Sequence, residues 1–427
     1  MNAPQAALAA RLAKLDPASR RRLRERLAQL RPAPHQLALT PGQHRLWGSA
    51  GHVVCQAVRL RGRVDPAALE ARLASFVQRH EALRTTFYSD GATVRPVVRS
   101  ALPPRVVRLR CSGLSEAEAV ARALSDEPFD LGTGPLLRVG LAEDASADET
   151  WLLLAVPNLV FDAWSFELLL DWLALPADPD DAPARPFSAF AADQVLWVDS
   201  AEGQAAAAYW TGVVADPPPP VAADRSDVAT DRTGRRIAFT LPGARATAVA
   251  AAARAEGATP FAGWLALFGA VLADFTGTPD VLVGTFTANR DRPGAAEIVG
   301  YLLNVLPLRL RNPVQADLQA WLRVARDQTR GALRHAAYPG ELIEGLALQA
   351  VFVFENLTPN PRRIQGALVE PVDVDRGAVR YDLTLSVQPG PGEVVCWLDY
   401  DQTRYAEATI RCLAERFATR ADEVTAP

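Results

Sequence analysis

One short segment of this 427-residue chain combines side chains that are suited to chemistry. Residues 157–165 read Pro-Asn-Leu-Val-Phe-Asp-Ala-Trp-Ser, so Asn158 offers a carboxamide, Asp162 a carboxylate and Ser165 a hydroxyl group. A carboxamide donates and accepts hydrogen bonds, but it takes up no proton at an accessible pH. Asn158 can therefore orient a reacting group, and it cannot act as a general base.

Histidines and cysteines are too sparse to suggest a metal centre. Imidazole is the usual base near neutral pH. A mechanism that uses it must draw on five histidines, which are His35, His44, His52, His80 and His335. The four cysteines form no C-x-x-C pair and lie far apart. We therefore expect no metal site and no disulfide framework.

Composition and charge exclude several classes of protein. Hydrophobic residues make up 49% and charged residues 22%, with a net charge of −4. This balance is typical of a globular protein and gives no reason to bind nucleic acid. Because no apolar run reaches the length of a membrane span and no secretory pattern opens the chain, we expect a cytoplasmic protein that uses no membrane.

The periodicity of apolar residues predicts two halves of mixed α/β structure. We expect strands at 53–60, 83–87, 93–98, 136–141, 151–156, 236–241, 281–286, 302–310, 348–354, 381–387 and 394–400. We expect helices at 65–80, 165–173 (capped by Ser165), 245–275 (with a break near 257), 318–335 and 406–421. The predicted domains are an N-terminal helical linker or docking segment (1–35), an N-terminal lobe (36–175) and a C-terminal lobe (176–427), with the ligand site between the lobes.

Several motifs make the chain resemble the condensation domains of nonribosomal peptide synthetases, which belong to the chloramphenicol acetyltransferase-like superfamily. They occur in the order of that family at residues 39–47, 79–87, 209–210, 280–290, 298–309, 335–339, 351–356 and 381–383. The resemblance implies two lobes that form a V-shaped pseudo-dimer with a central tunnel. It also implies a monomer that joins a donor acyl group to an acceptor amine, both carried on the phosphopantetheine arms of acyl or peptidyl carrier proteins. No bound cofactor is expected.

The chain departs from the family at its signature, His-His-x-x-x-Asp-Gly. With Asp162 aligned, Pro157 and Asn158 replace the two histidines, and Ala163 replaces the glycine. Three interpretations remain open. Asn158 is a working substitute that orients the substrate, or it marks a domain without catalysis, or the site is rebuilt for cyclisation, dehydration or another modification of a tethered substrate.

The resemblance also assigns roles to other residues. Asp162 should pair with Arg290 and hold the loop in shape, with a catalytic role as the alternative. Ser165 is a catalytic candidate because its spacing from Asp162 matches heterocyclisation relatives, although that motif is incomplete here. His80 should be a framework residue. The polar or aromatic residues expected to line the tunnel are Trp164, Tyr301, Asn304, His335, Tyr338 and Ser386.

These observations lead to a variant condensation domain that forms amide or ester bonds without the usual histidine. The alternatives are an inactive domain that recruits carrier proteins or tailoring enzymes, a site rebuilt for another modification, and an acyltransferase that uses soluble coenzyme A thioesters.

Overall fold

The computed structural model describes residues 37–48, 53–91, 93–144, 146–176, 184–225, 233–311, 317–355, 361–372, 374, 377, 379–390 and 392–424. The helices predicted within 1–35 lie outside these residues, as do His35 and His52. Met1–Ala38 and Leu39–Pro427 are separate units, and the fold described below is that of the second unit.

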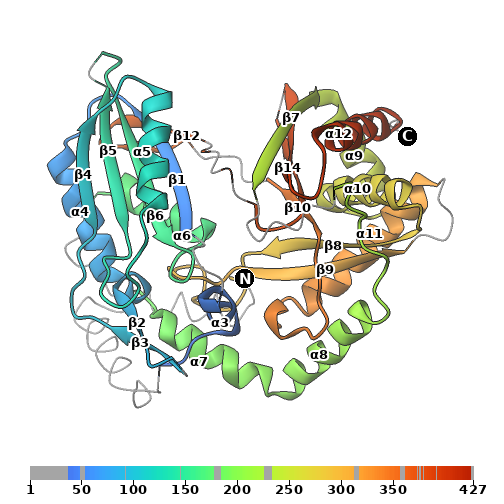
Figure 1. The fold of residues 1–427 in the computed structure, drawn as a ribbon, viewed down its shortest axis with the longest axis horizontal. Coiled ribbons are helices and arrows are strands. Elements are labelled where there is room, and N and C mark those ends of the chain that lie inside the picture. Colours follow the sequence, from blue (N-terminus) through green and yellow to red (C-terminus); the bar gives the residue numbers. More distant parts are fainter. Residues whose placement is uncertain are drawn as a thin grey trace, which may run out of the picture. The chain divides into compact units, whose positions relative to one another are not determined.

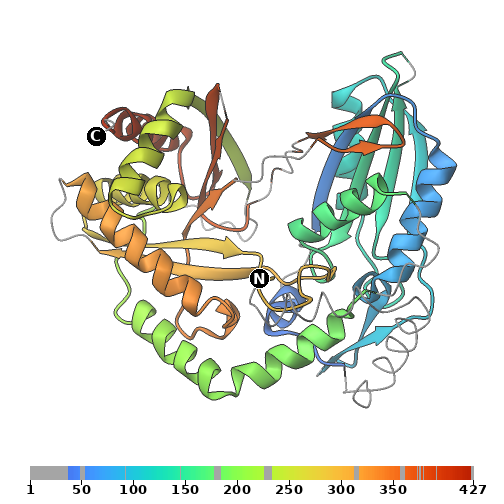
Figure 2. The ribbon, with the colours of Figure 1, turned by 180° about the vertical axis from the view of Figure 1, so that it is seen from behind.

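The first of two large sheets has six strands in the order β11-β12-β1-β6-β5-β4. Its strands are β1 (Val53–Arg61), β4 (Arg105–Arg110), β5 (Arg138–Asp144), β6 (Glu149–Pro157), β11 (Arg363–Ile364) and β12 (Ala367–Val372). Side chains alternate between the faces of a strand. On β6, Leu152 and Leu154 therefore join the core under α4 (Pro66–Arg79) and α6 (Ala163–Ala174), whereas Trp151 and Leu153 pack on α5 (Leu114–Asp126). Helices thus cover both faces of this sheet (Figures 1 and 2).

The second sheet also has six strands, in the order β7-β14-β13-β10-β8-β9. They are β7 (Gly234–Pro242), β8 (Asp280–Thr287), β9 (Asn304–Arg311), β10 (Ala350–Phe354), β13 (Leu383–Pro389) and β14 (Glu393–Asp401). One core joins its inner face to α9 (Gly243–Ala255), α10 (Pro260–Thr276), α11 (Leu318–Arg334) and α12 (Glu407–Asp422). Among the described residues, only the bent pair α9 and α10 has the length and apolarity of a membrane span, and no single helix does.

Smaller elements complete the part of the chain that the structure describes. They are α3 (Pro41–Gly48), a 3-10 turn η1 (Glu81–Arg84), a hairpin of β2 (Thr85–Ser89) and β3 (Val94–Val98), α7 (Phe187–Val198), α8 (Ala201–Val214) and a 3-10 turn η2 (Gly340–Leu342). The sequence patterns did not predict α3, β4, α5, α7, β11 and β12. Arginine occupies three of the six positions of β4 (105, 108 and 110) without regular alternation, and the strand lies at the edge of its sheet, so its apolar signal is weak.

Segments beyond residue 176 contribute to the first lobe. The strands β11 and β12 extend its sheet, with β12 paired antiparallel to β1. Phe187, Phe190, Ile298 and Leu302 join the apolar core of the same lobe. Three segments that follow residue 176 in the sequence thus pack in the first lobe: β11 with β12, the start of α7, and the residues around 298–302. Their apolar side chains are buried there because the core of that lobe accepts them.

Candidate functional site

Asn158 lies in a tight turn directly after β6. The backbone N–H of Val160 donates to the carbonyl of Pro157 at 3.0 Å, and Leu159, Val160 and Phe161 are buried in the core of the first lobe. Asn158 itself is only half-buried. Within the described part of the chain its amide forms no hydrogen bond. The loop is thus anchored by its apolar residues and presents an unengaged carboxamide.

Asp162 and Arg290 form a buried ion pair at the end of this loop. Nη2 of Arg290 lies 2.8 Å from both carboxylate oxygens, and the two side chains are 2% and 3% exposed. Asp162 also accepts hydrogen bonds from the backbone N–H groups of Ser165 and Leu302, at 2.8 and 3.1 Å. Burial lowers the pKa of the Arg290 guanidinium, and the charge of Asp162 opposes that shift. The carboxylate is therefore fully engaged in holding the two lobes together.

Ser165, the predicted catalytic candidate, takes part in a buried hydrogen-bond network beside Asp162. Its side chain is fully buried, and its hydroxyl donates to Asp162 at 2.7 Å and accepts from the N–H of Gly300 at 3.1 Å. The predicted helix cap is wrong. Asp162 is the N-cap of α6, because its carboxylate accepts from the N–H of Ser165, as aspartate commonly does at this position.

Trp164 connects the same loop to the segment around Ala296 by a hydrogen bond. Its indole N–H donates to the carbonyl of Ala296 at 3.0 Å, and the Arg290 guanidinium lies 5.7 Å from the ring. Tyr301 lies between Gly300 and Leu302, whose backbone N–H groups bind Ser165 and Asp162. The structure therefore brings these predicted site residues to one place.

Asn304 and Tyr338, both predicted to line the tunnel, lie in a buried network in the second lobe. The Asn304 amide donates to the carbonyls of Ala336 and Tyr338, both at 2.7 Å, and accepts from the N–H groups of Val305 and Gly340. All four of its hydrogen bonds are used. Tyr338 is 8% exposed and belongs to the core of the second lobe.

His335 and Ser386 lie in other parts of the second lobe. The ring of His335 stacks on Tyr209 at a centroid distance of 4.3 Å, and its carbonyl accepts from the indole N–H of Trp210. This places His335 in the contact between α8 and α11. Ser386 is on β13 opposite Val353 and Trp397, on the sheet face away from the core residues Leu385 and Val387.

His80 is a framework residue, as the motif indicated. It is 6% exposed, packs on Phe76 at 4.4 Å, and burial lowers its pKa to about 3. An unfolded chain binds the proton near pH 6.5, so between roughly pH 6 and 4 the unfolded state gains protons that the folded state does not. We expect the free energy of unfolding to fall by about 1 kcal/mol per pH unit over this range.

The measurement is urea denaturation of the wild type and of His80→Gln between pH 7 and 4. Glutamine does not titrate, so the variant should lose this part of the pH dependence even where it is less stable overall. Parallel curves for the two proteins would contradict a neutral, buried His80.

Gln43 belongs to the motif at 39–47, and the structure gives it a role beside Asn158. Its amide donates to the carbonyl of Leu159 at 2.9 Å and accepts from the N–H of Thr40 at 3.1 Å, while the hydroxyl of Thr40 accepts from the N–H of Gln43. This is a capping box at the start of α3. The Thr-x-x-Gln spacing at 40–43 was a signal that could have identified both the helix and its first residues.

A cavity of about 1630 Å³ lies in the second lobe, and no pattern in the sequence indicated it. It is bounded by α9, the start of α10, α11 and the carboxyl ends of β8, β10 and β13. Phe261, Phe286, Phe354, Leu303 and Leu306 are among its apolar lining residues. Arg254 supplies a positive charge, and Glu355 and Glu393 are the acidic residues of the lining. The volume and lining suit an extended, mostly apolar ligand.

Comparison with known proteins gives one consistent result. The family model of the condensation domain matches residues 35–426. The chain is 29% identical to the malpinin synthetase of Mortierella alpina, over 88% of this chain and 5% of that protein. It is also 29% identical to the phosphinothricin tripeptide synthetase PhsC of Streptomyces viridochromogenes, over 98% of this chain and 43% of that protein. The chain thus spans only part of the length of these relatives.

Solved structures show the same fold at low sequence identity. The X-domain from teicoplanin biosynthesis is similar with a TM-score of 0.82 and 22% identity, covering 92% of this chain and 96% of that one. The first condensation domain of the CDA synthetase gives 0.76 and 22%, with the same coverage. The predicted fold class, two chloramphenicol acetyltransferase-like α/β lobes, is confirmed; the tunnel stays a prediction.

Proposed function

The chain belongs to the condensation-domain family of nonribosomal peptide synthesis, and on that premise we propose that it joins carrier-bound acyl groups to a nucleophile without an imidazole. The supporting observation is the unengaged, half-buried amide of Asn158 on a loop that the Asp162–Arg290 pair holds in place. The amide is available to orient a substrate by hydrogen bonds.

Amide formation does not depend absolutely on a protein base. The amine attacks the thioester carbonyl, the carbon–nitrogen bond forms, the carbon–sulfur bond breaks, and the proton lost by nitrogen ends on the departing thiolate. An α-amino group has a pKa of about 8, so a fraction is already neutral at physiological pH. The missing imidazole would cost roughly 10²–10⁴-fold in rate, and orientation by Asn158 would retain the rest.

The cavity of the second lobe is where we place the acyl group and the arm that carries it. Exposed Arg254 lines it, and so do Thr259, the N-cap of α10, and Pro260, the first residue of that helix. A guanidinium and a helix N-terminus both favour the phosphate of a phosphopantetheine arm. The partners are accordingly acyl or peptidyl carrier proteins, one for the donor and one for the acceptor.

We expect Arg254→Glu to raise the KM for a loaded carrier protein about tenfold at low salt and to leave kcat nearly unchanged, because charge complementarity acts mainly on encounter and binding. The difference should shrink at high salt, where charges are screened. Arg416→Glu on α12 is the matched control, since Arg416 is also exposed and changes the net charge equally. An equal effect of both variants, or none, would contradict this placement of the arm.

A second candidate function is recruitment without catalysis. It is favoured by the lack of a proton acceptor at Asn158. A solved complex of the X-domain with OxyB from teicoplanin biosynthesis has a TM-score of 0.80 to this fold, at 22% identity. Under this alternative the chain would bind carrier proteins or a tailoring enzyme and leave the tethered substrate unchanged.

Intact-protein mass spectrometry with a loaded donor carrier and a loaded acceptor carrier distinguishes these functions. Transfer of the acyl group by the wild type, reduced in Asn158→Ala, supports condensation. Unchanged turnover in Asn158→Ala would contradict the role of Asn158. Unaltered substrates in the presence of wild type would favour recruitment, and loss of water from one tethered substrate would indicate a rebuilt site.

A further inference from the structure

A polar cluster next to α3 has buried atoms without a hydrogen bond of good geometry to a described residue, although the Arg380 guanidinium interacts with the Tyr301 phenol. It consists of Tyr301, Glu341, Arg380 and Tyr381, and we call it the α3 cluster. Tyr301 and Tyr381 are 2% and 5% exposed. Their hydroxyls and Oε1 of Glu341 are buried, and none forms a hydrogen bond of good geometry with a described residue. Since buried polar groups nearly always have partners, these three atoms have hydrogen-bonding capacity that an external polar group can use.

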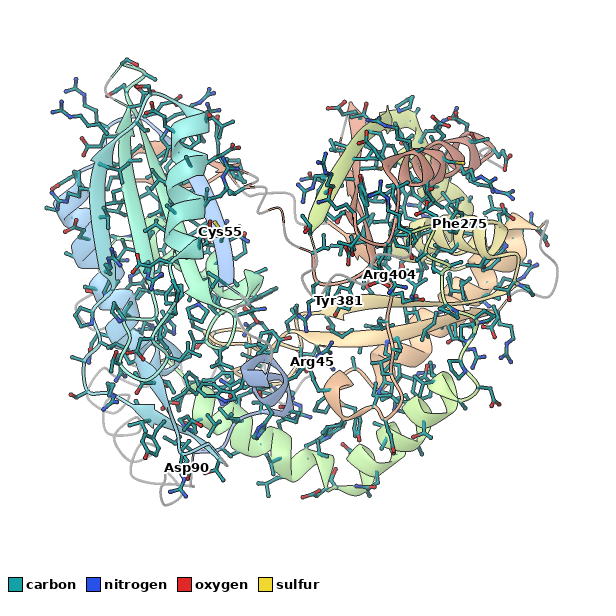
Figure 3. All side chains as sticks on the ribbon, in the orientation of Figure 1. Arg45, Cys55, Asp90, Phe275, Tyr381 and Arg404 are labelled. Atoms are coloured by element: carbon teal, nitrogen blue, oxygen red, sulfur yellow. The ribbon has the colours of Figure 1, made fainter. Side chains whose placement is uncertain are left out.

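Several contacts show that these residues lie together. A methyl group added to Gly42 of α3 would lie 2.7 Å from Cε1 of Tyr301 and 3.5 Å from Oε1 of Glu341, so both side chains approach the same point of the helix. The Arg380 guanidinium lies 5.6 Å from the ring centre of Tyr381 and is close to the Tyr301 phenol. Figure 3 labels Tyr381 beside β8 and Arg45 on α3.

The α3 cluster adjoins both the Asn158 loop and the cavity. Gln43, the residue after Gly42, binds the carbonyl of Leu159, which follows Asn158. Phe286 lines the cavity, and its ring lies 6.1 Å from that of Tyr381. The cluster therefore borders the region where the reacting groups would meet.

The donors and acceptors of the cluster match one end of an aminoacyl group. Its amine donates hydrogen bonds to a carboxylate, and its carbonyl oxygen accepts from phenols. Burial raises the pKa of Tyr301, so its phenol keeps its proton and stays a donor. A charge-assisted bond between amine and carboxylate is among the stronger ones available in a buried place.

We propose that the α3 cluster binds the aminoacyl end of the acceptor substrate, with Glu341 accepting from its amine and with Tyr301 and Tyr381 donating to its carbonyl oxygen. This rests on the proposed function, because it takes the acceptor to be a tethered aminoacyl group. These are positioning residues. They hold the amine in place, and Asn158 forms hydrogen bonds with the acyl group that the amine attacks.

The test uses two stable probes and the full chain. Alanyl-aminopantetheine has an amide in place of the thioester and carries the amine, whereas propionyl-aminopantetheine has the carbonyl and no amine. By isothermal titration, Glu341→Gln should weaken binding of the alanyl probe about tenfold or more and leave the propionyl probe within about twofold. Tyr301→Phe should weaken both probes, and Tyr381→Phe is the second variant if Tyr301→Phe fails to fold.

Tyr400→Phe is the control, because Tyr400 is also buried but belongs to the core of the second lobe. It should bind both probes as the wild type does. Absence of saturable binding of the alanyl probe to the wild type, equal affinities in all variants, or an equal loss for both probes in Glu341→Gln would overturn the proposal. A chain that shows the expected pattern and yet transfers no acyl group between loaded carriers would support the α3 cluster and contradict the proposed function.

Discussion

Replacing Asp162 by alanine should lower the free energy of unfolding by about 3–5 kcal/mol, the usual cost of removing one partner from a buried ion pair. The substitution leaves the Arg290 guanidinium, 3% exposed, without its counter-charge. It also removes the cap of α6 and the acceptor for the N–H of Leu302. Each of these losses adds to the effect, because each leaves a buried donor unsatisfied.

Urea denaturation followed by circular dichroism gives the measurement. The control is Glu407→Ala, which removes an exposed pair with Arg411 and should cost less than about 0.5 kcal/mol. The double variant Asp162→Leu with Arg290→Met should be more stable than Asp162→Ala, since no charge is then left buried. A loss below about 1 kcal/mol in Asp162→Ala would show that the pair does not hold the loop.

Introducing histidine at Asn158 should raise the rate of amide formation about 10²-fold or more, because an imidazole can accept the proton that the attacking amine loses. The rate should then rise with pH around a midpoint of about 6.5, where imidazole loses its own proton. Single-turnover transfer between loaded carriers, quenched at intervals and read by mass spectrometry, measures this step.

Asn158→Gln is the matched control. It keeps a carboxamide and adds bulk but no basicity, so it should show neither the higher rate nor the new pH dependence. If Asn158→His forms the amide no faster than the wild type, the missing base is not what limits the rate, and the idea that this site differs from a condensation site only in its base is contradicted.

The fold was largely accessible from the sequence because its elements carry strong local patterns. The β5–β6 hairpin, α4, α11 and the break between α9 and α10 follow from apolar periodicity and turn residues, and the structure contains all of them. The motif around Asp162 also indicated its pairing with Arg290, which lies 128 residues away in the sequence. The helices and strands are readable because local burial fixes their periodicity, whereas the Asp162–Arg290 pair was implied by the resemblance to the condensation domains.

What the side chains of the site do was decided by tertiary contacts. Asn304 and Ser165 have the residue types of ligand-binding groups, yet the fold uses their hydrogen bonds internally. The unsatisfied atoms of Tyr301, Glu341 and Tyr381 come together only because three distant segments meet beside α3.

The sequence by itself thus determined the family, the two α/β lobes and the absence of imidazole at residue 158, since these depend on residue identity and local periodicity. Only the tertiary structure decided which polar groups are engaged and which remain available, and where the cavity lies. The physical reason is that a hydrogen bond is satisfied by whichever partner the fold brings near, and a single sequence does not specify that partner.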